Sequence, residues 1–356
     1  MKIGIFDPYL DTLGGGEKYV LTIASCLSKQ HRVNVFWNES EILDKASGKF
    51  AIDLKKVQTT KDIFSASSNS LQRIWQIGSY DLLIFLSDGS IPFVPLKKLI
   101  LHFQFPVEWV NVSFKTKLKL LCTRKIICNS HFTKSYIDKK FNIKSIVLYP
   151  PVQIKQKRRV KKENIILHVG RFGNTIEGAN YKKQDVMIKA FKEMVDRGLK
   201  DWKFILIVGV KKEDEEQFKK LQKLTGGYPI EFLKNPMNSK LWEVYSQAKI
   251  YWHATGFGED LEKHPEYAEH FGISTVEAMG AGVVPVVINA GGQKEIVEEN
   301  KSGFLWDSLN QLKSRTEDLT KDESLWERLS QGAKQRSSVF GGDRFCREVC
   351  KIINEK

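Results

Sequence analysis

The chain alternates short apolar runs with longer amphipathic stretches, and this alternation constrains its fold more than any other feature. Runs such as KIGIFD (2–7) and RVNVFW (32–37) have the length and the β-branched content of strands. The stretches that follow, such as residues 17–30, place apolar residues at helical spacing. Continuous apolar strands separated by helices are typical of parallel sheets that are covered on both faces. The chain is therefore predicted to be of the α/β class.

The apolar runs fall into two series, which predict two domains. The seam is YPPVQIKQKRRVKKEN (149–164), where paired prolines and a polar, basic run are typical of a linker. A chain of 356 residues also exceeds the usual size of a single core. Open α/β sheets bind ligands outside the carboxyl ends of their strands, so a ligand is expected in the cleft between the domains. The predicted parts are a Rossmann-like domain at 1–152, a basic linker at 153–163 and a second Rossmann-like domain at 164–335.

The net charge of +14 is concentrated in residues 97–162, which hold 17 lysines and arginines against Glu108 and Asp138. Such an excess indicates a face that meets an anionic partner, with solvated loops and a basic linker as the alternative. Within it, SFKTKLKLLCTRKII (113–127) has the composition of a surface helix that rests on anionic lipid. Nucleic acid is not expected, because stacking aromatics and zinc or basic-zipper patterns are missing from the segment.

Compartment is predicted from the cysteines and the first residues. The chain starts with MKIGIFDPYL, a strand pattern rather than a secretory signal, and no apolar run is long enough to span a membrane. Its five cysteines form no CxxC pair and no zinc spacing. Cys346 and Cys350 are one helical turn apart and are expected to pack side by side. We therefore predict reduced thiols and a cytoplasmic protein.

A glycine-rich loop in DPYLDTLGGGEKYVL (7–21) follows the first strand and opens a helix near Gly16. Backbone amides in such a loop can approach a phosphate. A dinucleotide fingerprint needs a small residue where Tyr19 stands, although Glu39 could bind a ribose. A Rossmann oxidoreductase and a glycine turn without a ligand both remain alternatives for this loop.

A pair of cationic positions stands in HVGRFGNTIEGANYKKQDVMIKAF (168–191). Arg171 lies just past a strand end, and Lys182 or Lys183 opens the next helix. Cations at a helix N-terminus oppose the helix dipole, so they are poorly placed for stability alone. A diphosphate between Arg171 and the lysine would supply the missing negative charge. Solvation of both side chains is the alternative.

The stretch EHFGISTVEAMGAG (269–282) places two acids eight residues apart around a helix start. Ser274 to Glu277 matches a capping box, in which Ser274 accepts from an amide and Glu277 reaches back to the Ser274 amide. Gly272 separates Glu269 from this helix. The two acids are therefore expected to flank the free amides of the helix start, an arrangement that suits a ligand with a phosphate between two polyols.

Taken in order, these motifs resemble the retaining glycosyltransferases of family 4. The resemblance rests on EHFGISTVE with AMGAGVVPVVINAGGQKEIV, and on GGGEKY, NSHFTK (129–134), YPPV (149–152), VGRF with YKKQDVMIKAF, and FGGDRFCREV (340–349). It implies the GT-B fold: two Rossmann-like domains that face each other across a cleft, with a C-terminal helix at 336–356 that crosses back to the N-terminal domain. The N-terminal domain would bind the acceptor, and the C-terminal domain the nucleotide sugar.

The resemblance also implies a role for each matching residue. Glu277 would bind the ribose, and Glu269, with the backbone of Phe271 and Gly272, would hold the transferred sugar. His102, in LHFQFP, would lie near the reacting carbon, its alternative being a histidine satisfied at a strand end. The groups implied to face the diphosphate are Arg171, Lys182, the amides of Ser274 and Thr275, and Gly15 and Gly16 from the other domain.

The implied activity is transfer of a hexose, with retention, from a nucleotide-diphosphate sugar to a saccharide or lipid-linked acceptor in glycan biosynthesis. The wording EHFGI favours mannose and a GDP-sugar. No cofactor and no metal is expected, since no DxD pair stands at a suitable strand end. Peripheral contact with an anionic membrane would use the basic segment 97–162. A non-catalytic binding protein of the same fold is the alternative.

Two segments depart from the family's pattern. The loop GNTIEGANY (173–181) is longer than usual, so the choice between Lys182 and Lys183 stays open. Residues 255–268 are also expanded ahead of Glu269, and we expect them to form a lid over the sugar.

Overall fold

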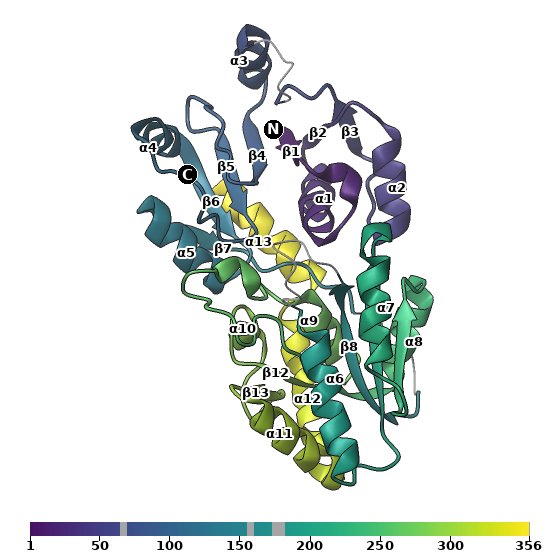
Figure 1. Ribbon diagram of the computed structural model, residues 1–356. Coiled ribbons are helices and arrows are strands. Elements are labelled where there is room, and N and C mark those ends of the chain that lie inside the picture. Colours follow the sequence, from purple (N-terminus) through teal and green to yellow (C-terminus); the bar gives the residue numbers. More distant parts are fainter. Residues whose placement is uncertain (65–69, 155–159, 173–181, 356) are drawn as a thin grey trace. The chain divides into compact units, whose positions relative to one another are not determined.

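The computed structural model describes residues 1–64, 70–154, 160–172 and 182–355 (Figure 1). The chain divides into two compact units. The N-terminal unit consists of Met1–Pro151 with Gly342–Lys356, and the C-terminal unit of Val152–Gly341. Residues 155–159 of the predicted linker and the whole loop 173–181 lie outside the described residues.

The N-terminal unit is built on a seven-stranded sheet whose described strand pairs are all parallel. The strand order is β3-β2-β1-β4-β5-β6-β7, so the chain starts in the middle and winds to one side and then to the other. This is the doubly wound order of a Rossmann-like sheet. Its strands are β1 (Lys2–Phe6), β2 (Arg32–Phe36), β3 (Val57–Thr60), β4 (Leu82–Ser87), β5 (Leu99–Phe103), β6 (Thr123–Cys128) and β7 (Ile146–Val147).

Both faces of this sheet are buried, which explains why its strands are apolar along their whole length. Ile5 pairs with Ile84 in register, and both enter a core shared with the helices of one face. Phe6 and Phe85, one residue on, enter the core of the opposite face. The first face is covered by α1 (Gly15–Ser28), α2 (Glu41–Phe50) and α13 (Gly342–Asn354), and the second by α3 (Ser70–Gly78), α4 (Phe114–Leu121) and α5 (His131–Phe141).

The C-terminal unit repeats this architecture with six strands in the order β10-β9-β8-β11-β12-β13. The central pair, β8 and β11, marks the point where the winding reverses, and ligands of such sheets bind at that point. Its strands are β8 (Glu163–Phe172), β9 (Lys203–Val210), β10 (Ile230–Lys234), β11 (Ala248–His253), β12 (Val284–Ile288) and β13 (Phe304–Trp306).

Helices cover both faces of this second sheet as well. Neighbouring residues of β11 show the alternation: Trp252 belongs to the core under α6, while the hydroxyl of Tyr251 reaches α9 on the other face. The helices of the unit are α6 (Gln184–Asp196), α7 (Glu215–Lys223), α8 (Asn238–Gln247), α9 (Ile273–Gly280), α10 (Gln293–Ile296), α11 (Leu309–Lys321) and α12 (Glu323–Ser338). Two Rossmann-like sheets in an α/β chain confirm the predicted fold class.

The C-terminal helix α13 belongs to the N-terminal unit, where it packs against α1. Phe345 is fully buried with its ring against Tyr19, and Arg344 donates to the carbonyl of Tyr149. Helix α12 ends at Ser338, and the chain re-enters the N-terminal unit at Gly342. Helix α13 is amphipathic, and it buries its apolar side in the first core.

The prediction of reduced cysteines was wrong in one pair. Cys26 of α1 and Cys346 of α13 form a disulfide, with their Cα atoms 5.3 Å apart. Cys122, Cys128 and Cys350 are free thiols. The bonded pair is 320 residues apart in the sequence, so no local spacing could indicate it. This disulfide removes the cysteine argument for a cytoplasmic location. Among the described helices, none is both long and apolar enough to cross a membrane.

Candidate functional site

Arg171 lies at the carboxyl end of β8, the first strand of the C-terminal unit. Its side chain is exposed, and no ion pair to its guanidinium is found within the described residues. Its backbone carbonyl accepts a hydrogen bond from the Gln184 side chain at 3.0 Å. Gln184 is fully buried at the start of α6, so this bond ties the strand end to the following helix. The backbone of Arg171 is therefore fixed at the carboxyl end of β8, and its exposed guanidinium can reach a ligand bound there.

Lys182 and Lys183 each pair with an acid, and the two acids differ. The ammonium of Lys182 lies 2.8 Å from Glu269 Oε2, and that of Lys183 lies 2.5 Å from Glu259 Oε1. Lys183 is the N-cap residue of α6, with φ of 57°. Of the two lysines, Lys182 is the one that meets a predicted site residue. Lys183 instead ties α6 to the segment 255–268, which the sequence suggested as a lid.

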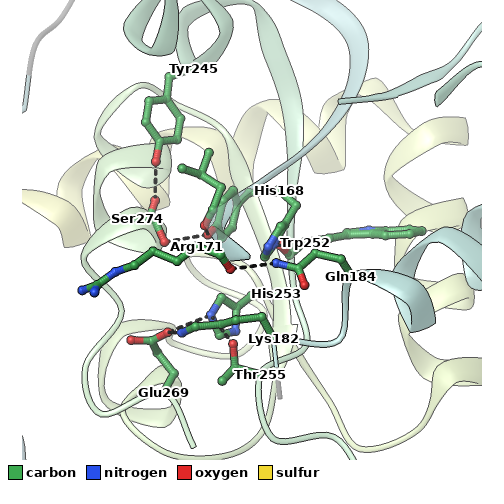
Figure 2. A network of polar contacts seen from close by, with 12 residues as sticks. His168, Arg171, Lys182, Gln184, Tyr245, Trp252, His253, Thr255, Glu269 and Ser274 are labelled. Atoms are coloured by element: carbon green, nitrogen blue, oxygen red, sulfur yellow. Dashed lines mark hydrogen bonds and ion pairs between the residues drawn. The ribbon is translucent and has the colours of Figure 1, made fainter. Parts of the chain in front are cut away.

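Glu269 is the centre of a polar network at this edge of the sheet (Figure 2). The same oxygen that meets Lys182 also lies 3.1 Å from His253 Nε2. Burial by itself would raise the pKa of Glu269, but the Lys182 charge and the His253 bond hold the pKa well below its usual value. Glu269 is therefore an ionised carboxylate with two donors, able to accept further bonds from hydroxyl groups.

His253 and the glycine pair Gly291–Gly292 complete the surroundings of Glu269, and none of them was among the site residues predicted from the sequence. His253 is the last residue of β11. The apolar pattern at 249–254 already indicated a strand that ends near this residue, and thus a side chain at the carboxyl edge of the sheet. The Gly292 amide donates to the Glu269 carbonyl at 2.7 Å. A Cβ on Gly291 would lie 2.3 Å from that same carbonyl oxygen. Only a glycine fits there.

The predicted capping box at the start of α9 was wrong. Helix α9 begins at Ile273, and its N-cap residue is Gly272, with φ of 118° and no side-chain cap. Ser274 Oγ lies instead 2.8 Å from the Tyr251 hydroxyl, and Glu277 accepts from the Tyr245 hydroxyl at 3.2 Å. Two fully buried tyrosines beneath the helix therefore compete with the local cap and redirect both side chains.

The remaining predicted residues of this unit lie around the same helix start. Phe271 is buried with its ring against Phe340, so its backbone rather than its side chain can face a ligand. A Cβ on Gly272 would lie 2.8 Å from the Gln293 side chain, which together with its positive φ requires glycine. The Thr275 amide donates to the Gly272 carbonyl at 3.1 Å.

The N-terminal unit contains the other predicted site residues. Gly15 and Gly16 are the first residues of α1, and the carboxylate of Glu17 accepts from the Gly14 amide. A Cβ on Gly16 would lie 2.6 Å from Gln104 Oε1, because the Gln104 side chain packs against this turn. Gly16 thus allows the start of α1 to pack closely against the Gln104 side chain.

His102 is fully buried at the end of β5, and its ring stacks on that of Tyr19 at a centroid distance of 4.2 Å. Within the described residues, neither ring nitrogen has a hydrogen-bond partner. Burial lowers its pKa to about 3, so the imidazole is neutral at physiological pH. Among the described residues, His102 thus lacks the hydrogen bonds that the alternative interpretation, a purely structural histidine at a strand end, would require.

Residues 151–336, slightly more than half of the chain, match the family described as glycosyl transferases group 1. A GDP-Man:Man(3)GlcNAc(2)-PP-Dol alpha-1,2-mannosyltransferase of Dictyostelium discoideum is 24% identical over 77% of this chain and 54% of its own length. The corresponding Xenopus laevis protein is 29% identical over 64% and 45%. The chain thus spans about half the length of these curated relatives. An uncharacterized glycosyltransferase of Haemophilus influenzae is 24% identical over 99% of both chains.

Solved glycosyltransferase structures share the fold over the full length of this chain. Anabaena HepE, crystallised with UDP, superposes with a TM-score of 0.74 at 17% identity and covers 99% of both chains. WaaG, a glycosyltransferase involved in lipopolysaccharide biosynthesis, superposes with a TM-score of 0.64 at 14% identity over both whole chains. The chain belongs to the glycosyl transferases of group 1.

Proposed function

We propose that this enzyme transfers a hexose, with retention of configuration, from a nucleotide-diphosphate sugar to a saccharide or lipid-linked acceptor. The observation that carries the proposal is the convergence of Lys182, Glu269 and the start of α9 at the carboxyl edge of the second sheet, beside Arg171. Positive groups and a polyol-binding carboxylate at one edge are what a sugar joined to a diphosphate requires.

In this proposal the donor's parts are divided among the residues around α9. Glu269 and the backbone at Phe271 and Gly272 hold the sugar hydroxyls, and Glu277 holds the ribose. Tyr245 supports this role for Glu277, because its hydroxyl orients the carboxylate. The groups assigned to the diphosphate are Arg171, Lys182 and the amides at Ser274 and Thr275, with Gly15 and Gly16 from the N-terminal unit; His102 is assigned to the reacting carbon.

The chemistry follows from where charge develops. Cleavage of the glycosyl–phosphate bond builds positive charge on the sugar ring and negative charge on the departing diphosphate. Fixed cations and amides that stabilise the leaving group lower this barrier directly. We assign that work to Arg171 and Lys182 without a metal ion. A diphosphate oxygen would take the acceptor's proton on the face from which it leaves, so no carboxylate acts as a nucleophile.

For the donor we propose a GDP-sugar, with mannose as the hexose. EHFGI points to mannosyltransferase relatives, and the curated relatives from Dictyostelium and Xenopus carry GDP-Man in their names. HepE, crystallised with UDP and glucose, makes a UDP-sugar the rival donor. Thermal-shift screening against GDP-, UDP- and dTDP-sugars separates these. A nucleotide at 100 times its Kd adds about 2.7 kcal/mol of stability. A panel without any shift or transfer would contradict the proposed function.

For the acceptor side we propose contact with an anionic membrane through α4. Phe114, Leu118 and Leu121 lie one turn apart along this helix, and their exposed fractions are 81%, 48% and 73%. Lys115 and Lys117 stand beside them in the sequence. An apolar stripe with flanking cations is the pattern of a helix that lies in a membrane interface. Each cation near anionic lipid contributes about 1 kcal/mol.

The test is flotation with anionic and zwitterionic vesicles. Replacing Phe114 and Leu121 by serine is expected to abolish flotation with anionic vesicles, because the apolar anchor is lost. Leu224→Ser, at an exposed leucine of the C-terminal unit, is the matched control. Equal flotation of the wild type with both kinds of vesicle would contradict a role for the basic segment.

A further inference from the structure

Glu269 Oε2 has two donors that come from different parts of the C-terminal unit (Figure 2). Lys182 precedes α6 and approaches with a long, flexible side chain, at 2.8 Å. His253 stands at the end of β11, a strand with neighbours on both sides, at 3.1 Å. Lys182 can move away from Glu269 by rotating the bonds of its aliphatic side chain, whereas His253 is held in place by the sheet.

The hydrogen bonds of His253 indicate that it donates through Nε2. Its ring is buried, and Thr255 Oγ1 lies 3.1 Å from the same nitrogen. Among the described residues, Nδ1 has no hydrogen-bond partner. A proton on Nδ1 would be a buried donor without an acceptor, so the neutral tautomer with Nε2–H is favoured. Burial lowers the pKa of His253, in agreement with a neutral ring at physiological pH.

The main chain of Glu269 is also held, so its carboxylate needs only a side-chain donor to stay in one orientation. The Gly292 amide bonds to its carbonyl at 2.7 Å, and Gly291 packs directly against it. The fixed backbone and the His253 bond together constrain the side chain at both ends. Neither contact involves Lys182.

We propose that His253 is a positioning residue of the donor site. It holds the Glu269 carboxylate toward the sugar when the Lys182 side chain swings away from Glu269 to bind the diphosphate. The proposal rests on the proposed function, in which Lys182 binds the diphosphate and Glu269 the sugar. A carboxylate that loses its ammonium partner in a partly buried site needs another donor. His253 is that donor, and the sugar hydroxyls add theirs.

The experiment compares binding of the nucleotide sugar identified by the donor panel with binding of the matching nucleoside diphosphate, which lacks the sugar. His253→Leu is expected to weaken binding of the nucleotide sugar by about tenfold or more, since a bond to a charged group is lost. Affinity for the nucleoside diphosphate is expected to stay within about twofold. His253→Gln, whose amide can donate from the place of Nε2, is expected to restore most of the lost affinity. Lys182→Met is expected to weaken both ligands, because it removes a diphosphate contact.

His168→Leu is the matched control, because His168 is a fully buried histidine of the neighbouring strand whose ring bonds to the Trp252 carbonyl instead. If His253→Leu does not fold, His253→Asn replaces it, since its shorter amide does not reach Glu269. Equal weakening of both ligands in the His253 variants would overturn the proposal, as would a His253→Gln variant no better than His253→Leu. A wild-type protein that binds the diphosphate and the sugar nucleotide equally well would overturn it too. If the wild type binds neither, the proposed function itself fails.

Discussion

At the scale of single residues, the two acids of the E-x7-E motif are held by buried aromatic and basic neighbours rather than by the helix between them. Glu269 meets Lys182 and His253, and Glu277 meets Tyr245. The spacing of the motif was visible in the sequence, but these neighbours were not. The capping box failed because two tyrosine hydroxyls, one from α8 and one from β11, contact the start of α9, and only the tertiary fold brings them there.

Glu277 allows ligand binding to be separated from support of the fold. Glu277→Ala removes one of two acceptors of the buried Tyr245 hydroxyl, which keeps the Ser274 carbonyl at 3.3 Å, so the loss is expected to be about 1 kcal/mol of unfolding free energy. Glu277→Gln keeps an acceptor oxygen, so its stability is expected to stay close to that of the wild type. Both variants are expected to bind the nucleotide at least about tenfold more weakly, because a charged partner of the ribose is lost. Denaturation and calorimetry on the two proteins check this. Unchanged nucleotide affinity in Glu277→Gln would contradict the ribose role.

At the scale of elements, Lys162 joins the ends of two helices to the start of β8. Its ammonium donates to the carbonyls of Ala248 and Ala281, at 2.9 and 2.8 Å, where α8 and α9 end. A cation suits the negative end of a helix dipole. Burial nevertheless lowers the pKa of Lys162 from 10.5 to about 7, with a smaller contribution from the Lys334 charge.

This lowered pKa predicts a stability that depends on pH. Between about pH 7 and 10.5 the unfolded chain binds a proton at Lys162 that the folded chain does not hold. The unfolding free energy therefore gains a contribution as pH rises through this window, and loses it as pH falls toward 7. Urea denaturation from pH 7 to 10 is expected to show this rise in the wild type relative to Lys162→Met. Lys240→Met, at an exposed lysine paired with Glu243, serves as control. Parallel pH profiles for the wild type and Lys162→Met would count against the prediction.

At the scale of the whole molecule, both ends of the chain belong to the same unit, because the last helix, α13, is part of the N-terminal unit. The Cys26–Cys346 disulfide makes that return covalent and encloses the entire C-terminal unit in one loop. Arg344 strengthens the return by donating to the carbonyl of Tyr149. The C-terminal helix is thus part of the N-terminal core, and not an appendage.

Loss of the disulfide is expected to destabilise the N-terminal unit by about 2–5 kcal/mol, because the unfolded chain gains freedom when a long loop is opened. Cys26→Ser with Cys346→Ser provides the comparison, and this variant is expected to be insensitive to reductant. Alkylation of the unreduced, denatured wild type should modify three cysteines, namely Cys122, Cys128 and Cys350. Modification of all five would show that the pair is not bonded.

The sequence by itself determined the architecture and the family. Apolar strands alternating with amphipathic helices can satisfy their backbone groups and bury their side chains only in parallel sheets covered on both faces. The order of short motifs along the chain then singled out one family. Both features depend on the local sequence and not on contacts between distant parts of the chain.

Only the tertiary structure decided which side chains meet. Lys182 and Glu269 are 87 residues apart, Tyr245 and Glu277 are 32 apart, and Cys26 and Cys346 are 320 apart. Their contacts depend on strand order and on which face each residue occupies, and a local pattern does not specify either. His253 is the clearest case: the sequence marked a strand end, and the fold turned it into a partner of Glu269.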